Sequence, residues 1–180
     1  IQAIGVAAAQ GSHKGVVING VDAALEAELS AINRFMRAGD LTALQDNRWG
    51  IVLGQTLANR LGIGLGDNVD LFSTSISINP ITPLATFKGF EVVGIYRVGA
   101  AELDGNLVMI NLSAARALFR LRTPYNAVHI RTVDVLQAET VRLEVMADLL
   151  GALRGESWVA TLGAIYENIQ FSRGIISFML

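Results

Sequence analysis

The stretch Gly-Val-Val-Ile-Asn-Gly-Val-Asp at residues 15–22 predicts a strand that leads directly into a helix. β-branched residues between glycines are typical of a short buried strand, and an aspartate after such a run is a preferred helix N-cap. Apolar residues recur at helical spacing as far as Gly39, so we expect one packing helix over residues 22–39. The residues on its apolar face are Leu25, Leu29, Ile32, Phe35 and Met36.

Further along the chain, short strands and helices alternate. We expect strands at residues 15–21, 49–53, 69–71, 90–98, 106–111, 127–131 and 157–161. Helices are expected at residues 55–61, from a cap at Ser113 to Phe119, and from a cap at Asp134 to about Leu149. Residues 103–105 are expected to form a turn. This order predicts an α+β protein with a mostly antiparallel sheet.

The composition narrows the class of protein. Of 180 residues, 52% are hydrophobic and only 17% charged, the net charge is −2 and there is no cysteine. A chain of this length can bury a core, and the absence of a basic block argues against a nucleic-acid partner. A disulfide scaffold and a thiolate metal site are excluded.

No motif for catalysis is present. His13 and His129 have no neighbouring ligands at metal-binding spacing, and there is no G-x-S-x-G nucleophile elbow. The glycines of residues 62–66 leave a helix and enter a strand, whereas a dinucleotide loop runs from strand to helix. We therefore predict no catalytic, cofactor or metal site. An enzyme built from dispersed residues stays open as an alternative.

A proline-containing segment, residues 73–88, is the candidate for partner binding. Pro80 and Pro83 argue against a central strand and favour a projecting loop or edge hairpin. It carries the apolar residues Ile81, Leu84 and Phe87, a pattern that favours a partner-binding element. The alternative is that these side chains fold back onto the domain.

The two ends of the sequence lead to a further expectation. Residues 174–180, Gly-Ile-Ile-Ser-Phe-Met-Leu, are apolar or small without a terminating signal. They fit the first two turns of a membrane-spanning helix, which needs about 20 residues, or an ordinary C-terminal helix docked on the core. Because Ile1 is neither an initiator Met nor part of a signal peptide, we expect an internal fragment.

Several short blocks carry a family resemblance in their order and spacing. They are Val17-Ile18-Asn19-Gly20-Val21-Asp22, Ile51-Val52-Leu53-Gly54, Leu57-Ala58, Leu61-Gly62, Gly66-Asp67 with Val69, Val92-Val93-Gly94-Ile95 and Leu103-Asp104. Together they resemble the periplasmic domain of the lipoprotein-releasing permease family, the LolC/LolE type, which is related to MacB-like efflux permeases. The tail looks more like LolE than LolC, through Ser157-Trp158, Gly163, Tyr166, Ile169-Gln170 and Arg173.

The resemblance implies a fold and a location. The fold would be a MacB-like periplasmic core, with a porter-like α/β subdomain formed by residues 1–20 and 126–173. Residues 21–125 would form an inserted β-rich subdomain, and residues 174–180 would begin a transmembrane helix. The porter-like part would lack its first strand and helix, so we expect weak support for the first residues. The domain would lie in the periplasm as part of an inner-membrane permease.

The implied function is transport without catalysis. A permease pair of identical or paralogous subunits, driven by a separate cytoplasmic ATPase, would extract lipoproteins from the inner membrane and pass them to a soluble periplasmic carrier. In a LolC-like subunit the carrier would dock on the loop that here contains Asn79, Pro80, Ile81, Pro83, Leu84 and Phe87. The alternative, if the chain is LolE-like, is that this loop does not bind the carrier. Lipoprotein acyl chains would border Ile175, Ile176, Phe178 and Met179. The alternative is a MacB-like efflux or mechanotransmission permease that contacts an adaptor.

Overall fold

The computed structural model describes residues 1–73, 86–149 and 154–158. The chain forms two compact units, residues 1–129 and residues 130–180. The predicted grouping of residues 1–20 with residues 126–173 stays a prediction.

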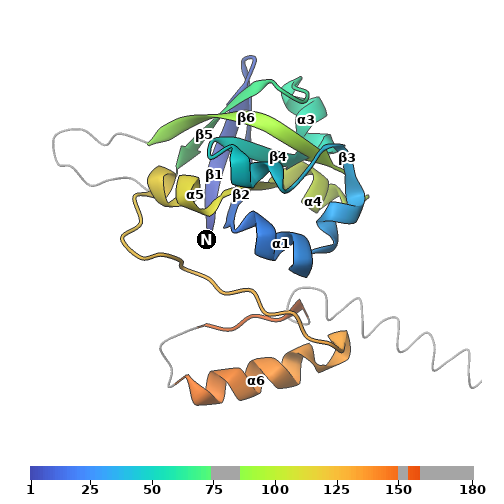
Figure 1. Ribbon diagram of the computed structural model, residues 1–180, viewed down its shortest axis with the longest axis vertical. Coiled ribbons are helices and arrows are strands. Elements are labelled where there is room, and N and C mark those ends of the chain that lie inside the picture. The colour runs from blue at the N-terminus through green and yellow to red at the C-terminus, as the bar shows by residue number, and fades with distance from the viewer. Residues whose placement is uncertain (74–85, 150–153, 159–180) are drawn as a thin grey trace, which may run out of the picture. The chain divides into compact units, whose positions relative to one another are not determined.

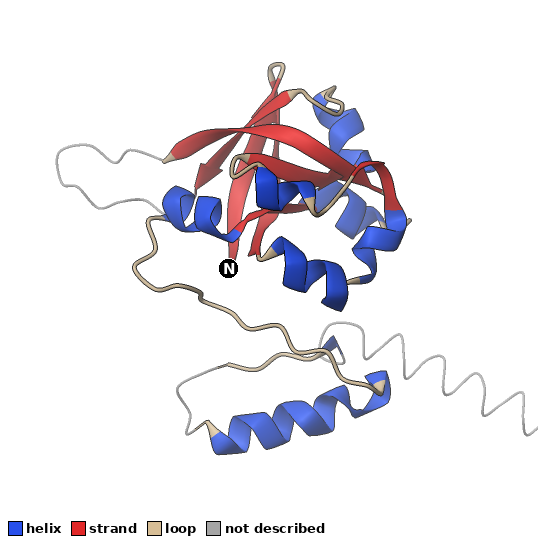
Figure 2. Cartoon of the chain, viewed as in Figure 1, coloured by secondary structure: helices blue, strands red, loops and turns tan. Residues whose placement is uncertain are grey.

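The first unit is built on a seven-stranded sheet of order β3-β6-β4-β7-β2-β1-β5, in which β6 also pairs with β5 (Figures 1 and 2). The strands are β1 Gln2–Ala9, β2 Ser12–Val21, β3 Met36–Gly39, β4 Gly50–Gly54, β5 Asn68–Ser73, β6 Phe87–Tyr96 and β7 Leu107–Asn111. The pairing of β5 with β6 closes the strands β6-β4-β7-β2-β1-β5 into a ring. Only β2–β7 and β4–β6 are parallel among these pairs, which confirms a mixed α+β fold with a mostly antiparallel sheet.

Short helices connect the strands. In the first unit these are α1 Ala23–Leu29, the 3₁₀ helix η1 Ala31–Phe35, α2 Ala43–Asp46, α3 Gln55–Leu61, α4 Ala101–Asn106 and α5 Leu112–Phe119. The second unit holds the 3₁₀ helix η2 Val135–Gln137 and α6 Ala138–Asp148. Among the residues described, no helix is long and apolar enough to cross a membrane.

Two hydrophobic cores lie on opposite faces of the sheet. The larger one fills the inside of the ring, where alternate strand residues such as Val16, Ile18 and Leu71 pack with side chains of α3 and α5. The smaller core lies outside the ring, where Val52, Met109 and Tyr96 are covered by α1, α2 and Leu41. This core packs helices against the exterior of β4 and β7.

The predicted helix over residues 22–39 is wrong beyond its first two turns. Asp22 caps α1 as expected, since its carboxylate accepts from the backbone N–H groups of Ala24 and Leu25 at 3.1 and 3.3 Å. Ser30 then ends α1 and caps η1 by accepting from the Ile32 N–H at 3.1 Å, because serine competes for local backbone donors. Residues 36–39 leave the helix altogether and form β3, which pairs with the edge of β6. Leu25, on the predicted apolar face, is 58% exposed.

Two local predictions near β7 need correction. Residues 103–105 lie inside α4 and do not form a turn. The cap of α5 is Asn111, whose Oδ1 accepts from both the backbone N–H and the hydroxyl of Ser113 at 2.8 Å. The helix therefore begins one residue before the predicted Ser113 cap, because the Asn side chain supplies the same capping oxygen.

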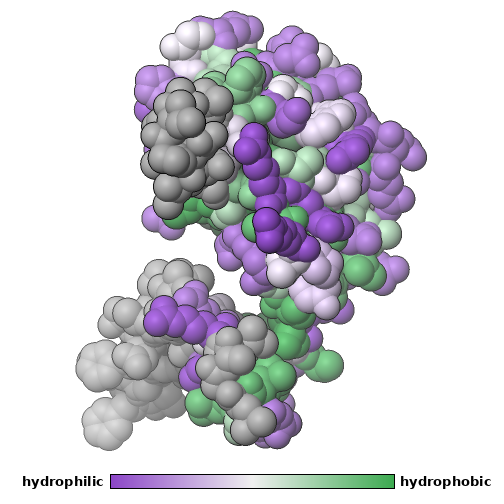
Figure 3. All heavy atoms as spheres, turned by 90° about the vertical axis from the view of Figure 1, so that its left-hand side faces the viewer, coloured by the Kyte–Doolittle hydropathy of each residue, from purple (hydrophilic) through white to green (hydrophobic). Residues whose placement is uncertain are grey.

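The predicted strand at residues 127–131 is also absent, and these residues lie in neither a helix nor a strand. A strand forms only where a neighbour offers main-chain partners, and the start of β1 is bonded otherwise. The Asn126 side chain accepts from the Gln2 N–H and donates to the Gln2 carbonyl, both at 2.9 Å. Tyr125 and Val128 are 59% and 75% exposed, and hydrophobic residues reach the surface on the face drawn in Figure 3.

Strand β1 was not predicted, and the expected weak support for the first residues is wrong. Residues 2–9 pair along their length with β2 and partly with β5. Four alanines and a glycine give this segment a low intrinsic preference for strand. It becomes a strand because two neighbours satisfy its backbone.

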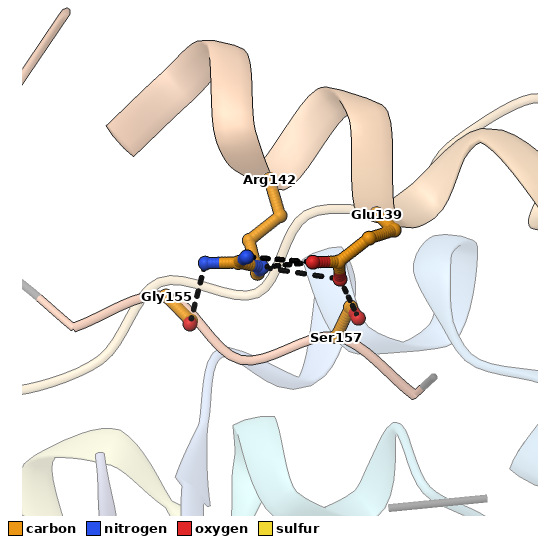
Figure 4. A network of polar contacts seen from close by, with 4 residues as sticks. All are labelled: Glu139, Arg142, Gly155 and Ser157. Carbon is orange, nitrogen blue, oxygen red and sulfur yellow. Dashed lines mark hydrogen bonds and ion pairs between the residues drawn. The ribbon is translucent and has the colours of Figure 1, made fainter. Parts of the chain in front are cut away.

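In the second unit, a polar network ties α6 to the segment that follows it (Figure 4). Arg142 and Glu139 form an ion pair at 2.6 Å, and the Ser157 hydroxyl donates to Glu139 at 2.5 Å. The Trp158 indole N–H donates to the Val135 carbonyl at 2.8 Å. The predicted helix is confirmed over residues 138–148, but Gln137, rather than Asp134, is its N-cap residue. Residues 157 and 158 are not in a strand.

Candidate partner-binding surface

The predicted partner-binding segment connects two paired strands. β5 and β6 are antiparallel, with Phe72 opposite Phe87, and the Ser73 N–H donates to the Thr86 carbonyl at 2.8 Å. Residues 74–85 therefore connect two antiparallel strands, but neither is an edge strand, because β5 also pairs with β1 and β6 also pairs with β4. Of the predicted contact residues, Asn79, Pro80, Ile81, Pro83 and Leu84 lie outside the described residues. Phe87 is the first residue of β6.

The base of this hairpin carries an aromatic pair. The rings of Phe72 and Phe87 stack with centroids 5.3 Å apart and an interplanar angle of 22°. Their neighbours Leu71 and Phe90 point into the core, so the stacked pair lies on the opposite, exterior face of the sheet. Phe87 is 55% exposed, which leaves one of the largest apolar side chains of the unit in contact with solvent.

A second aromatic group nearby carries positive charge. Trp49 precedes β4 and packs edge-on against the buried Phe90, with ring centroids 5.6 Å apart. The guanidinium carbon of Arg48 and the ammonium nitrogen of Lys88 lie 5.1 and 5.6 Å from the centre of the Trp49 ring. Both distances allow cation–π attraction. Lys88 is paired with the inward-pointing Leu71, so this cationic group projects from the opposite face of the strands to the stacked phenylalanines.

These additional residues were not singled out by the sequence reasoning. The signal that could have found Phe72 is the alternation of Val69, Leu71 and Ser73, which places Phe72 on the other face of the strand. No sequence signal links Trp49 to Lys88, because their proximity depends on the parallel pairing of β4 with β6.

A separate hollow of about 450 Å³ lies where β2 and β7 end and α1 and α5 begin. Its polar lining includes Asp22, Asn111 and Arg116. Asp22 and Asn111 are already engaged as helix caps. These two polar residues therefore line the hollow because they cap the helices that begin there.

The residues considered for chemistry stay dispersed. His13 lies in β2 and His129 in the extended segment, and both are exposed. Within the described ranges, no group of three His, Cys, Asp or Glu residues could hold a metal ion. Ile175, Ile176, Phe178 and Met179 lie outside these ranges.

The fold is similar to that of an extracellular domain of an ABC-type transporter. The extracellular domain of the noncanonic ABC-type transporter YknZ from Gram-positive bacteria has the same fold, with a TM-score of 0.51 and 13% identity. The similarity covers 83% of this chain and 74% of that one. The family model of the MacB-like periplasmic core domain matches residues 2–148, and the chain belongs to this family.

Curated relatives agree with the predicted resemblance. The chain is 23% identical over 168 residues to the lipoprotein-releasing system transmembrane protein LolC of Xylella fastidiosa and 27% identical over 171 residues to LolC of Neisseria meningitidis. It is 23% identical over 164 residues to LolE of Haemophilus influenzae. These matches cover 93%, 94% and 91% of this chain, but only 40%, 41% and 39% of the relatives. Since relatives of both names match, the preference for LolE over LolC stays a prediction.

Proposed function

We propose that the chain is the periplasmic domain of an ABC permease subunit that extracts outer-membrane-destined lipoproteins from the inner membrane and hands them to a soluble periplasmic carrier. The observation that carries this proposal is the match of more than nine-tenths of the chain to relatives named lipoprotein-releasing system transmembrane proteins. The family of the MacB-like periplasmic core domain supports the assignment to a permease in the inner membrane.

In this proposal the hairpin between β5 and β6 is the docking element for the carrier. Its base offers the stacked pair of Phe72 and Phe87 on the exterior face, while Lys88 lies over Trp49 on the opposite face of the strands. An exposed aromatic side chain supplies a large apolar contact at a small loss of conformational entropy. Residues 79–84 would add the apolar and proline side chains of the connection.

The chemistry of the cycle would occur elsewhere. ATP hydrolysis belongs to a separate cytoplasmic subunit, and a second permease subunit, identical or paralogous, completes the transporter. This domain would present surfaces and would itself catalyse no reaction. The apolar residues at positions 175, 176, 178 and 179 would border the acyl chains of the bound lipoprotein, because burial of alkyl groups in an apolar surrounding is favourable.

A second candidate is the periplasmic domain of a MacB-like efflux permease. The family match and the YknZ-like fold favour it as much as they favour lipoprotein release. Such a permease would bind a periplasmic adaptor protein at the hairpin. Pull-down of the full-length permease with a lipoprotein carrier and with an adaptor, in parallel, separates the two.

Site-specific photo-crosslinking in the full-length permease complex tests the proposal. Positions 81 and 84 should crosslink to the carrier, and positions 175 and 178 to a lipoprotein. Leu25 on α1 is 58% exposed and lies on a different element, so position 25 is the matched control and should stay silent. Silence at all four test positions in an assembled complex would overturn the proposal, and an adaptor adduct at position 81 or 84 would favour the efflux permease.

A further inference from the structure

The hollow at the ends of β2 and β7 lies where the chain divides between the two faces of the sheet. β2 and β7 are parallel neighbours, with Val21 opposite Asn111, and each leads directly into a helix. α1 follows β2 onto the exterior of the ring, where Ala23 joins the smaller core, whereas α5 follows β7 to the inside, where Ala114 and Leu118 join the larger core. A crevice outside the carboxyl ends of parallel strands, where successive helices take opposite faces, is a general place for ligand binding.

Part of the polar lining keeps the hollow in shape. Besides accepting from Ser113, Asn111 donates from Nδ2 to the Leu44 carbonyl at 2.8 Å. This bond ties α2 to the end of β7 and keeps Gln45, the next residue of α2, at the border of the hollow. The hollow is thus bordered by α1 and α2 from the exterior face and by α5 from the interior face.

Three polar groups of the lining have unused hydrogen-bonding capacity. Within the described residues, the guanidinium of Arg116, the side-chain amide of Gln45 and Oδ2 of Asp22 form no hydrogen bond or ion pair. Arg116 and Asp22 have opposite charges, yet the ion pair between Arg142 and Glu139 is the only one in the described part of the chain. The charged atoms of Arg116 and Asp22 therefore lie beyond ion-pair distance, with the hollow between them.

This arrangement of charges suits a ligand that carries both signs. A plain anion at Arg116 would also meet the carboxylate of Asp22, and a plain cation at Asp22 would meet the guanidinium. A zwitterion avoids both repulsions and satisfies both groups. Since Arg116 and Gln45 approach from opposite faces of the sheet, a tetrahedral phosphate can accept from both, whereas a planar carboxylate presents its oxygens in one plane.

We propose that the hollow binds a small zwitterion with a phosphodiester and a primary ammonium group, the chemistry of an ethanolamine phosphate headgroup. Arg116 and Gln45 would donate to the phosphate oxygens, and Oδ2 of Asp22 would accept from the ammonium group. The volume of about 450 Å³ is within the usual range for small-molecule sites. Because all three side chains are exposed, water screens each ionic contact and we expect weak binding.

Ligand-observed NMR on the full-length permease in detergent tests the proposal, because this measurement detects weak binding. Glycerophosphoethanolamine is the probe. Glycerophosphoglycerol, the same phosphodiester without the ammonium group, is the matched comparison. The wild-type permease should bind the first about three- to fivefold more tightly. Equal affinities, or no binding of glycerophosphoethanolamine, would overturn the proposal.

Two conservative variants assign the charges. Asp22→Asn keeps a good N-cap for α1 and removes the carboxylate, so it should abolish the preference while glycerophosphoglycerol still binds. Arg116→Gln keeps a good helix former and should weaken binding of both ligands about three- to fivefold. The control Arg60→Gln, on the exposed end of α3 outside the hollow, should change neither affinity.

The result for Asp22→Asn is a ratio of two affinities in one protein, so a loss of folded material does not imitate it. An unchanged preference in Asp22→Asn, or unchanged affinities in Arg116→Gln, would show that these groups do not form the site.

A comparison in nanodiscs distinguishes the two sources of such a headgroup. If the natural ligand is a lipid, nanodiscs of phosphatidylethanolamine should compete with glycerophosphoethanolamine, whereas nanodiscs of phosphatidylcholine should not. Equal binding of the probe in both nanodiscs identifies a free zwitterion as the ligand. None of these measurements involves the lipoprotein carrier, so the failure of this inference would leave the proposed function standing.

Discussion

Replacing Asp104 by Ala should destabilise the first unit strongly. Asp104 is only 3% exposed, and its carboxylate oxygens accept from the backbone N–H groups of Val98 and Gly99 at 2.8 and 2.9 Å. These bonds hold the β6–α4 connection closed. Removing the carboxylate leaves two donors without their partner, each worth about 1–3 kcal/mol when buried. The two donors together would cost about 2–6 kcal/mol. Because Gly99 is exposed and water can reach it, we expect a loss in the lower half of this combined range, about 2–4 kcal/mol.

The assay is equilibrium urea unfolding followed by the fluorescence of Trp49, in a Trp158→Phe background so that only the first unit reports. Glu102→Ala is the matched control, since Glu102 lies on the same helix α4 and is exposed. It should change the free energy of unfolding by less than about 0.5 kcal/mol. If Asp104→Ala and Glu102→Ala differ by less than that amount, the carboxylate does not hold this connection and the reasoning is refuted.

Two further predictions concern packing and pH. In Gly20→Ala the new Cβ would lie 2.2 Å from the Cβ of Ala115, so this variant should lower the free energy of unfolding by about 1–3 kcal/mol. Gly15 has open space around it, so the control Gly15→Ala should leave the free energy of unfolding unchanged. Equal effects of the two variants in urea unfolding would contradict the close contact at Gly20. Hydrogen bonds from Arg142 and Ser157 lower the pKa of Glu139 from 4.5 to about 2, so the stability they add is present above pH 4.5 and is lost as the pH falls towards 2. Glu139→Gln should remove this dependence of stability on pH, which can be followed through the indole N–H resonance of Trp158. A pH titration of this resonance that is unchanged in the variant would show that another group is responsible.

Elements encoded by local pattern were predicted well. The β-branched run at residues 15–21 forms the end of β2, the helix at 55–61 is α3, and Asp22 is the cap of α1. The missed strands are β1 and β3, whose alanine, glycine and arginine residues have little preference for strand. Their strand geometry comes from neighbours distant in the chain. The strand predicted at 127–131 failed for the converse reason, since a good local pattern found no partner strand.

For the candidate partner-binding surface, too, the sequence predicted one part and only the structure revealed the other. The prolines in the sequence predicted a projecting loop or edge hairpin over residues 73–88, and the structure adds that β5 and β6 on either side of it are paired. The partners of Phe87 were not predictable, since Phe72 lies 15 positions away and meets it only through the hairpin register. Arg48 and Lys88 share one indole ring through the pairing of β4 with β6.

The sequence by itself determined that this is an α+β chain without a motif for catalysis, with a proline-bearing segment and a pattern shared with lipoprotein-releasing permeases. Those properties follow from residue type and short-range spacing, which fix backbone preferences, caps and the presence or absence of reactive groups. Only the tertiary structure decided that the strands close into a ring and that Ile4, Val17 and Phe87 lie on one exterior face. Strand register is a non-local property, and a shift of one residue would have turned these side chains to the opposite face.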